Sequence, residues 1–390
     1  MKSFFYGLYA VMFNIFRILP MNKIKVTFLS PHNGGFRDSL GEVMEEVIRR
    51  DEFIVKAVDC GVLRQTGMRS VSAVFSRIRE AIVFFTVNAF HLATSKYVFL
   101  NDNFMPMAKL NFRKEAVITQ LWHAEGAFKK FGLDIDQPEE IRRLELEGCK
   151  KLSYVVCSSE SVVDIYAGAF GISDYKVLPL GSARSDYFFR RLNEEKLRAR
   201  FDRRYPDCRG KKLVLYAPTF RDDPADDEKL LESFDIRAFN DRFGGEYALL
   251  IRLHPQVHTD PGRLEGAVNV SGYENVNELV RLTDVLITDY SSICMDFALT
   301  EKPIYFYAFD FDKYNSERSF YDEYEKYIPG PLTDDFTTLL NLISSGLSET
   351  YRNRMYKFRT YNFGSPDGHA AQRIVDRIIY GAAEEAGNDE

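Results

Sequence analysis

Short apolar, β-branched runs alternate with helical stretches along most of the chain. This alternation is typical of strand–helix units on a parallel sheet. The runs form two series, so the pattern predicts an α/β chain with two doubly wound lobes. The first series is Ile24–Leu29, Ile54–Val58, Tyr97–Leu100, Val117–Trp122, Tyr154–Cys157 and Lys176–Leu180, and the second is Leu213–Ala217, Tyr247–Leu253, Val268–Val270, Val285–Thr288 and Ile304–Tyr307.

The two series are separated near residues 186–210 by a predicted charged helix, Asn193–Arg204, and the turn sequence YPDCRG. A further helical stretch, Gly368–Ala383, is expected to pack back across the lobes. The predicted divisions are an N-terminal segment 1–20, an N-terminal lobe 21–195, a C-terminal lobe 205–350 and C-terminal helices 351–390.

The N-terminal segment is rich in apolar and aromatic residues. Its run Phe4–Leu19 is shorter than the roughly 20 residues that span a bilayer, and no small-residue cleavage site precedes the first strand. Helical spacing predicts an amphipathic segment whose aromatic face lies in a membrane interface; the alternative is a helix packed on the domain. That face comprises Phe4, Phe5, Leu8, Tyr9, Met12, Phe16 and Leu19.

Composition narrows the class of protein. A chain of 390 residues with 45% apolar side chains can bury the cores of two domains. Its net charge of -6 disfavours nucleic acid as a partner. The five scattered cysteines favour a reducing compartment over a disulfide framework or structural zinc site, and no histidine or carboxylate motif predicts a metal.

Ligands of open α/β sheets bind outside the carboxyl ends of the strands, and with two lobes we expect them in the cleft between the lobes. In TQLWHAEGAFKKFG, Trp122 and His123 end a strand, and Gly126 and Lys129 follow. Imidazole can take a proton near neutral pH, and lysine with backbone amides can hold phosphate. The alternative is a structural histidine beside a core tryptophan.

Two motifs of the second lobe have the same placement. In LLIRLHP, strand alternation sets Arg252 and His254 on one face, a pair suited to a diphosphate unless the residues are merely solvated. In DVLITDYSSICMDFA, Ser291 and Ser292 begin a helix and can cradle an anion, and Asp296 can accept a hydrogen bond from a hydroxyl group. The alternative is a helix N-cap with a first-turn acid.

Three weaker motifs also follow strands. LYAPTFRDD and LPLGSARSD place polar groups where a phosphate-bearing ligand can bind. SPHNGGFRDS can shape the side of the cleft where a second substrate would bind. A double glycine is weak evidence, and no dinucleotide fingerprint is present. Their candidate residues are Pro218, Thr219, Gly181, Ser182, Arg184, Gly34, Gly35 and Asp38.

LWHAEGAFKKFG, LYAPTFRDD, IRLHP, DVLITDYSSICMDFA, KPIYFYAFDFDKY and FGSPDGHAAQRIVDRII occur in this order, and together they resemble the CDP-glycerol glycerophosphotransferase family of wall teichoic acid synthesis over roughly residues 20–382. The resemblance implies two Rossmann-like lobes of glycosyltransferase B (GT-B) type, residues 21–195 on the acceptor side and 205–350 binding the CDP donor. It implies transfer of glycerol or ribitol phosphate from CDP-glycerol or CDP-ribitol to a lipid-linked polymer, with CMP released.

The resemblance assigns the catalytic roles to His123 and His254. We take His123 as the base and His254, with Arg252, as the diphosphate clamp, although the two roles are interchangeable at this stage. The donor-binding positions implied by the resemblance are Ala124, Glu125, Gly126, Arg184, Pro218, Thr219, Arg252, Ser291, Ser292 and Asp296.

One departure concerns the polyol and the acceptor. Many family members read WHGTPLKKLG where this chain has WHAEGAFKKFG, with Glu125 in the altered part. The resemblance also implies peripheral, monotopic attachment to the inner leaflet at the cytoplasmic face, without a cofactor, a metal or nucleic acid. Two rival functions remain: a nucleotide-sugar-dependent GT-B glycosyltransferase of envelope polysaccharide synthesis, and a non-enzymatic envelope scaffold.

Overall fold

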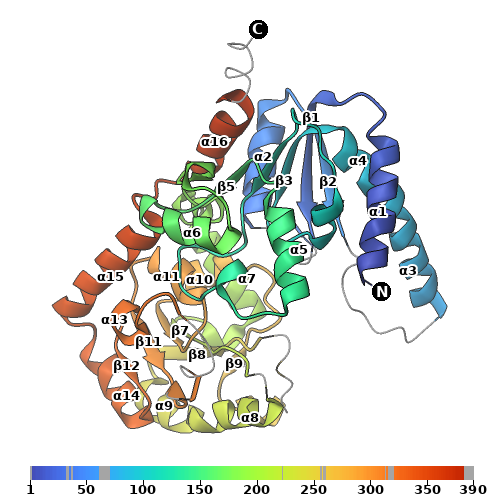
Figure 1. Ribbon diagram of the computed structural model, residues 1–390. Coiled ribbons are helices and arrows are strands. Elements are labelled where there is room, and N and C mark those ends of the chain that lie inside the picture. Colours follow the sequence, from blue (N-terminus) through green and yellow to red (C-terminus); the bar gives the residue numbers. More distant parts are fainter. Residues whose placement is uncertain are drawn as a thin grey trace. The chain divides into compact units, whose positions relative to one another are not determined.

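A computed structural model describes residues 2–31, 35–36, 38–60, 71–221, 223–254, 257, 261–311, 313–314 and 320–381. The chain divides into two compact units, which are followed by colour in Figure 1. Unit 1 is Met1–Tyr187 with Asn362–Glu390, and unit 2 is Phe188–Tyr361. Each unit contains a six-stranded sheet whose neighbouring strands pair in parallel. The predicted α/β class with two sheets is confirmed.

The sheet of unit 1 has the order β2-β1-β3-β4-β5-β6. The chain therefore adds strands on one side of β1 and then on the other, which makes the carboxyl ends of β1 and β3 a topological switch point. The strands are β1 (Asn22–Ser30), β2 (Ile54–Asp59), β3 (Ser95–Leu100), β4 (Val117–Gln120), β5 (Tyr154–Val156) and β6 (Val177–Leu178).

Helices cover both faces of this sheet. Val26 and Phe28 share a buried core with the helix α2 and the C-terminal residues Ile374 and Ile378. On the other face, the Lys25 ammonium lies 4.6 Å from the centre of the Phe90 ring. The α-helices of unit 1 are α1 (Lys2–Phe16), α2 (Ser39–Arg50), α3 (Val71–Val83), α4 (Ala89–Thr94), α5 (Glu139–Cys149), α6 (Val163–Phe170) and α16 (Ala370–Val375).

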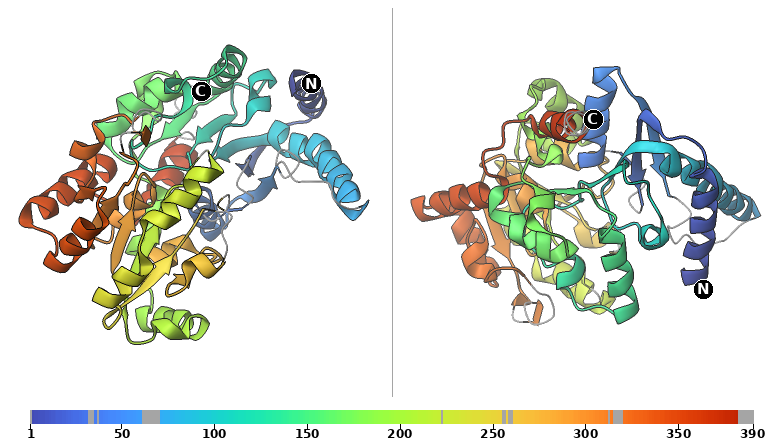
Figure 2. Two further views of the ribbon diagram at one scale, coloured as in Figure 1. Left: turned by 90° about the horizontal axis from the view of Figure 1, so that it is seen from below. Right: turned by 45° about the horizontal axis from the view of Figure 1, so that its top comes forward.

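Helix α1 packs on unit 1 through only one of its sides. Tyr9 and Phe13 are buried, and Tyr9 lies 4.3 Å from Phe84, measured between ring centres. Phe4 and Leu8 are exposed, so the single aromatic face predicted from helical spacing is wrong: apolar residues surround the helix, and Tyr9 belongs to its packed side. In Figures 1 and 2, α1 and α3 lie at the same edge of unit 1. Among the described residues, no helix is long and apolar enough to cross a membrane.

The sheet of unit 2 has the order β12-β11-β10-β7-β8-β9, so its switch point lies between β7 and β10. Its strands are β7 (Lys212–Ala217), β8 (Tyr247–Ile251), β9 (Val268–Asn269), β10 (Val285–Thr288), β11 (Ile304–Tyr307) and β12 (Leu332–Thr333). Its helices are α7 (Glu194–Arg204), α8 (Pro224–Ser233), α9 (Ile236–Phe243), α10 (Val276–Leu282), α11 (Ile293–Ala298), α13 (Tyr324–Tyr327), α14 (Phe336–Ser345) and α15 (Glu349–Phe363).

The predicted charged helix illustrates why these segments are helical. The Asn193 side chain accepts a hydrogen bond from Lys196 N and caps α7, which has acidic residues in its first turn and basic residues in its last. The predicted stretch 368–383 is α16 followed by a π-helical turn, Asp376–Tyr380, and residues 382–383 lie outside the described part.

Five strands, β4, β5, β6, β8 and β9, end one or two residues earlier than the apolar runs predict. β4 ends at Gln120 and β8 at Ile251, and the runs extend further because Leu121 and Leu253 are also buried. Arg252 and His254 follow the end of the strand, but Leu253 between them is buried and they are not, so their predicted position on one face stays a prediction. Pro255, the last residue of the LLIRLHP motif, lies outside the described residues.

Candidate functional site

The turn after β4 places His123 at the carboxyl edge of the unit 1 sheet. Trp122 has φ 58°, a left-handed backbone conformation that is rare for a bulky residue and costs about 1–3 kcal/mol. Its buried ring stacks on Phe131, with 5.2 Å between the ring centres. The His123 side chain is 38% exposed. Packing of Trp122 thus stabilises a strained turn that presents a histidine, an arrangement common at functional sites.

His123 contacts the end of the neighbouring strand β3. Its Nδ1 lies 3.2 Å from Asn101 O and 3.8 Å from Asp102 Oδ2. Asn101 and Asp102 were not among the predicted site residues, although both directly follow a predicted strand. The rule that selected His123 would have found them.

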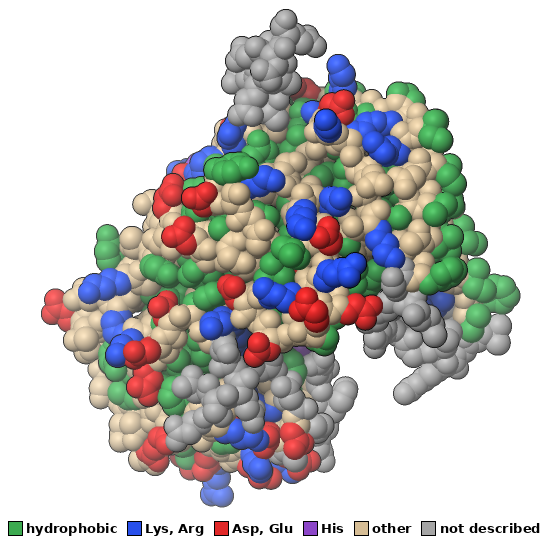
Figure 3. Space-filling model, viewed as in Figure 1, with side chains coloured by type: hydrophobic (Ala, Val, Ile, Leu, Met, Phe, Trp, Pro, Cys, Tyr) green, Lys and Arg blue, Asp and Glu red, His purple; other side chains and the backbone are tan. Residues whose placement is uncertain are grey.

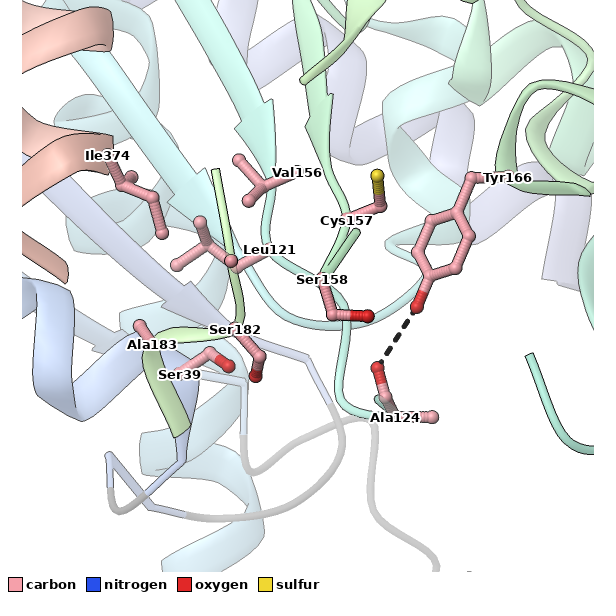
Figure 4. Close-up of a pocket in the computed structure, with 11 residues that line it drawn as sticks. Ser39, Leu121, Ala124, Val156, Cys157, Ser158, Tyr166, Ser182, Ala183 and Ile374 are labelled. Carbon is pink, nitrogen blue, oxygen red and sulfur yellow. Dashed lines mark hydrogen bonds between the residues drawn. The ribbon is translucent and has the colours of Figure 1, made fainter. Parts of the chain in front are cut away.

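The segment after His123 is held by hydrogen bonds from three separate parts of unit 1. Tyr166 donates to Ala124 O at 3.2 Å and Gly126 O at 3.1 Å, and Figure 4 shows the first of these bonds. Gly126 N donates to Ser158 Oγ, and Ala127 N donates to Asn362 Oδ1, both at 3.1 Å. These contacts fix the loop. Donor binding by Ala124 and Gly126 stays a prediction.

Glu125 connects this loop to the loop after β6. It is 7% exposed and accepts a hydrogen bond from Ser182 Oγ at 2.6 Å. In the same loop Arg184 N donates to Ser39 Oγ at the start of α2. The adjoining cavity of about 10 Å³ is the size of one water molecule, and Figure 4 shows Ser39, Ser158 and Ser182 around it. The structure therefore brings the predicted residues Glu125 and Arg184 to one group of loops.

The turn after β1 also reaches this edge. Asp38 caps α2, because its Oδ1 accepts a hydrogen bond from Leu40 N at 2.9 Å. Gly34 lies outside the described residues, and Gly35 precedes the helix without being part of it. The site role of Asp38 is thus at least partly structural.

In unit 2, His254 lies against the turn that follows β7. Its ring stacks on Phe220 with 4.5 Å between the ring centres. Partial burial lowers the pKa of His254, although the Asp227 carboxylate acts in the opposite direction. The neutral imidazole is therefore favoured at neutral pH.

Arg252 binds backbone carbonyl groups of its own unit. Its Nη1 donates to Val270 O at 3.1 Å and to Tyr273 O at 3.0 Å, at the end of β9. The guanidinium group therefore stabilises the loop between β9 and α10. The other N–H groups of Arg252 can still donate to a diphosphate, so its role as a diphosphate ligand stays a prediction.

A buried ion-pair cluster lies at the switch point of unit 2. The Arg221 guanidinium is 2.9 Å from Asp289 Oδ2 and donates from Nε to Asp310 Oδ2 at 2.7 Å. Arg221 is 7% exposed and Asp289 is fully buried. Burial lowers the pKa of Arg221, the two carboxylates raise it, and the net effect is a rise. This cluster was not predicted from the sequence, although its members lie within four residues of the ends of β7, β10 and β11.

The cluster joins the two predicted donor-side turns. Asp289 Oδ1 accepts a hydrogen bond from Thr219 N at 2.7 Å. The turns after β7 and β10, which both contain predicted site residues, therefore contact each other. Pro218 is buried at the end of β7. Thr219 Oγ1 is buried and has no hydrogen-bond partner within the described part of the chain, which leaves it able to bind a ligand or water.

The predicted anion cradle is smaller than expected. Helix α11 has six residues, and the amides of Cys294 and Met295 already donate to Ser291 O and Ser292 O. Ser292 is exposed and its side chain makes no capping hydrogen bond, so the simple N-cap alternative is wrong for Ser292. Asp296 is 4% exposed. An anion at this turn would therefore be bound by the two serine hydroxyl groups rather than by the dipole of a long helix.

No group of three or more His, Cys, Asp or Glu side chains suited to a metal ion occurs among the described residues. The five cysteines are all buried and free. The candidate chemistry of both units therefore rests on imidazole, hydroxyl, amide and guanidinium groups at the strand ends.

The chain has two parallel six-stranded sheets with candidate site residues at their carboxyl edges, and it belongs to the GT-B fold class. The chain belongs to the family CDP-Glycerol:Poly(glycerophosphate) glycerophosphotransferase, whose model matches residues 11–380. The family resemblance inferred from six ordered motifs is confirmed.

Named relatives build teichoic acids. The teichoic acid poly(ribitol-phosphate) polymerase of Bacillus spizizenii is 31% identical over 397 residues, covering 98% of this chain and 60% of the polymerase. The teichoic acid ribitol-phosphate primase of the same organism is 32% identical over 296 residues, covering 74% of this chain and 76% of the primase. The chain thus spans about three fifths of the polymerase and three quarters of the primase.

The wall teichoic acid polymerase TagF has the same fold. Its structure superposes with a TM-score of 0.75 at 20% identity, covering 97% of this chain and 95% of the TagF chain. A TagF structure obtained after soaking with CDPG gives a TM-score of 0.73.

Proposed function

We propose that the chain transfers glycerol phosphate or ribitol phosphate from CDP-glycerol or CDP-ribitol to a lipid-linked teichoic acid or related envelope polymer, releasing CMP. Family membership over residues 11–380 supports this reaction class. The observation that carries it is the strained turn after β4, which presents His123 beside the switch point of unit 1.

In the proposed reaction, an acceptor hydroxyl oxygen forms a bond to the phosphorus that bears the polyol. The bond from that phosphorus to the bridging oxygen breaks, and CMP leaves with the electron pair. His123 Nε2 takes the hydroxyl proton. Positioning and electrostatic stabilisation supply most of the rate in such phosphoryl transfers.

The phosphate groups of the donor are assigned to unit 2. We assign Thr219, Ser291 and Ser292 to its phosphate oxygens and Asp296 to a hydroxyl group, supported by their position at the switch point. Arg252 and Pro218 shape this side. The loop 124–126 and Arg184 are assigned to the donor from unit 1.

A panel of CDP-glycerol, CDP-ribitol and UDP-sugars, offered with a lipid-linked primer, tests the function. We expect CMP release and product masses that increase by polyol phosphate units with one of the CDP donors. Transfer from a UDP-sugar would instead establish the glycosyltransferase alternative. Absence of nucleotide binding by calorimetry would favour a scaffold.

The lowered pKa of His254 predicts how donor binding depends on pH. The group stays neutral at pH 7 and gains its charge only below the ordinary imidazole value of about 6.5. Affinity for CDP-glycerol, whose diphosphate is fully ionised, should therefore increase on acidification and level off only below the pKa of His254 in the free protein, which is lower than the ordinary value. Calorimetric titrations between pH 5 and 8 measure this increase.

Two variants control this prediction. His254→Ala should abolish the acidic increase in affinity, and Phe220→Ala should move it to higher pH because the imidazole loses its stacking partner. An increase that has already levelled off above pH 6.5 in the unaltered protein, or one that persists in His254→Ala, contradicts the assignment.

We also propose that α1 and α3 attach the chain peripherally to the inner leaflet, at the cytoplasmic face. Both helices expose large apolar side chains, including Val11 and Ile15 at 55% and 51% and Phe75 and Ile82 at 69% and 59%. Figure 3 shows apolar side chains along this edge of unit 1. Exposed apolar surface of this kind is favourable in a membrane interface.

Replacing Leu8, Val11 and Ile15 by glutamine should weaken partitioning to anionic vesicles more than tenfold, because burial of three such side chains contributes about 3 kcal/mol. Vesicle flotation measures the effect. These positions point away from the packed side of α1, so folding is preserved. A matched triple variant at Ile48, Ile54 and Ile135, which are 55%, 40% and 42% exposed, should bind normally. Equal flotation of both triple variants would locate attachment elsewhere.

A further inference from the structure

β3 and β4 end side by side at the edge of unit 1. Leu100 is the register partner of Gln120, and Leu121 N donates to Leu100 O at 2.7 Å. The chain leaves both strands at the same level. Asn101 and Asp102 therefore lie directly beside the turn that carries His123.

Gln120 joins these two turns through its side-chain amide. Its Nε2 donates to Asp102 O at 3.2 Å, and its Oε1 accepts from Trp122 N at 3.0 Å. Gln120 is 1% exposed, so water does not compete for these bonds. The opposite orientation of the amide would set donor against donor and acceptor against acceptor. Gln120 thus has one orientation, and it fixes the strained backbone of Trp122.

The carbonyl of Asn101 determines the tautomer of His123. A carbonyl oxygen only accepts hydrogen bonds, so the contact of 3.2 Å to Nδ1 requires the proton to be on Nδ1. The lone pair of the neutral ring is then on Nε2. This is the nitrogen that a general base at this position must offer.

Asn101 is itself fixed from behind. It is fully buried, and its Nδ2 donates to Asp38 Oδ2 at 2.5 Å. The other oxygen of Asp38 caps α2, so the position of the Asn101 carbonyl is tied to the start of a twelve-residue helix.

We infer that Gln120, Asn101 and Asp102 are positioning residues that hold His123 as the Nδ1-protonated tautomer and present Nε2 to the acceptor hydroxyl. The inference rests on the proposed role of His123 as the base. Asp102 adds a charge effect, because its carboxylate lies 3.8 Å from Nδ1 and stabilises the imidazolium that forms when Nε2 takes a proton. None of the three touches the substrate in this scheme.

Kinetics of Gln120→Met test the positioning role. Methionine has a similar length but neither hydrogen bond, so kcat should fall at least about tenfold while KM for the CDP donor changes less than about twofold. Asp102→Asn should lower kcat in the same way. The matched control is Gln137→Met, which removes a glutamine bonded to Gly132 O and Glu145 Oε2 elsewhere in unit 1 and should leave kcat unchanged.

The same substitution in a His123→Ala background separates positioning from folding. If Gln120 acts through His123, Gln120→Met should have no further effect on the residual rate. An equal tenfold loss in both backgrounds would overturn the inference, because the side chain would then act independently of the histidine.

Nitrogen NMR of selectively labelled histidine tests the tautomer without any activity, so it stays informative if the proposed function is wrong. At pH about 8.5 the His123 signals, assigned with His123→Ala, should be those of the Nδ1-protonated form. In Gln120→Met they should shift toward a mixture. A predominantly Nε2-protonated ring in the unaltered protein overturns the inference.

Discussion

His123→Ala should lower kcat at least about 100-fold and leave the melting temperature unchanged. The rate falls because the strained turn after β4 then carries no group that can take the hydroxyl proton. The side chain is partly exposed and its ring hydrogen bond goes to a backbone carbonyl, so its removal leaves no buried charge. Single-turnover kinetics with a CDP donor and a primer measure the effect.

The control is a histidine of the same unit outside the strand ends. His369 is exposed and precedes α16, so His369→Ala should have kcat within about twofold of the unaltered protein. Normal turnover by His123→Ala at matched thermal stability would remove this residue from the mechanism and transfer the base role to His254.

Arg221→Met should destabilise the protein by about 3–5 kcal/mol, the largest stability effect that we expect from one substitution. The change leaves the fully buried Asp289 carboxylate and the largely buried Asp310 carboxylate, which is 12% exposed, without their cation, and desolvated charges are costly. Tyr290 and Tyr314 also lose a guanidinium group that lies 5.2 Å from each ring centre. Chemical unfolding of the whole chain measures the difference.

An exposed pair of the same unit provides the comparison. Arg263 is 3.2 Å from Glu232, and the two side chains are 39% and 64% exposed, so Arg263→Met should cost no more than about 1 kcal/mol. Adding Asp289→Asn and Asp310→Asn to Arg221→Met should recover part of the loss, because fewer unpaired charges remain. Equal stability of Arg221→Met and Arg263→Met would show that the cluster contributes little.

The apolar runs in the sequence predicted the correct limits of two strands that are buried on both faces. β10 and β11 have the predicted limits, since every residue in them is buried and turn residues follow at once. β4 and β8 were predicted too long because the buried residues Leu121 and Leu253 extend the apolar runs beyond the strand ends. The two-residue strand β12 was not predicted, since it has no apolar run around it, whereas β6 and β9 lie within longer apolar runs.

The strand-end rule selected His123 and His254 but not the groups that surround them. Asn101 acts on His123 through a backbone carbonyl, which carries no signature in the side-chain sequence. Arg221, Asp289 and Asp310 are distant in sequence, and only the sheet order β11-β10-β7 brings them together. Polar residues follow nearly every strand, so their pairing depends on register that sequence pattern does not specify.

The position of Asn362 at the boundary between the two units affects the order in which they fold during synthesis. It is the first residue of unit 1 after the chain returns from unit 2, and it is fully buried against the His123 loop. Ile374, Val375 and Ile378 then cover one face of the unit 1 sheet. On the ribosome, unit 2 is continuous and has all its strands before these residues exist, so it should complete its fold first. The nascent unit 1 keeps an uncovered apolar face until these residues have been synthesised, and a chaperone has most to bind during that period.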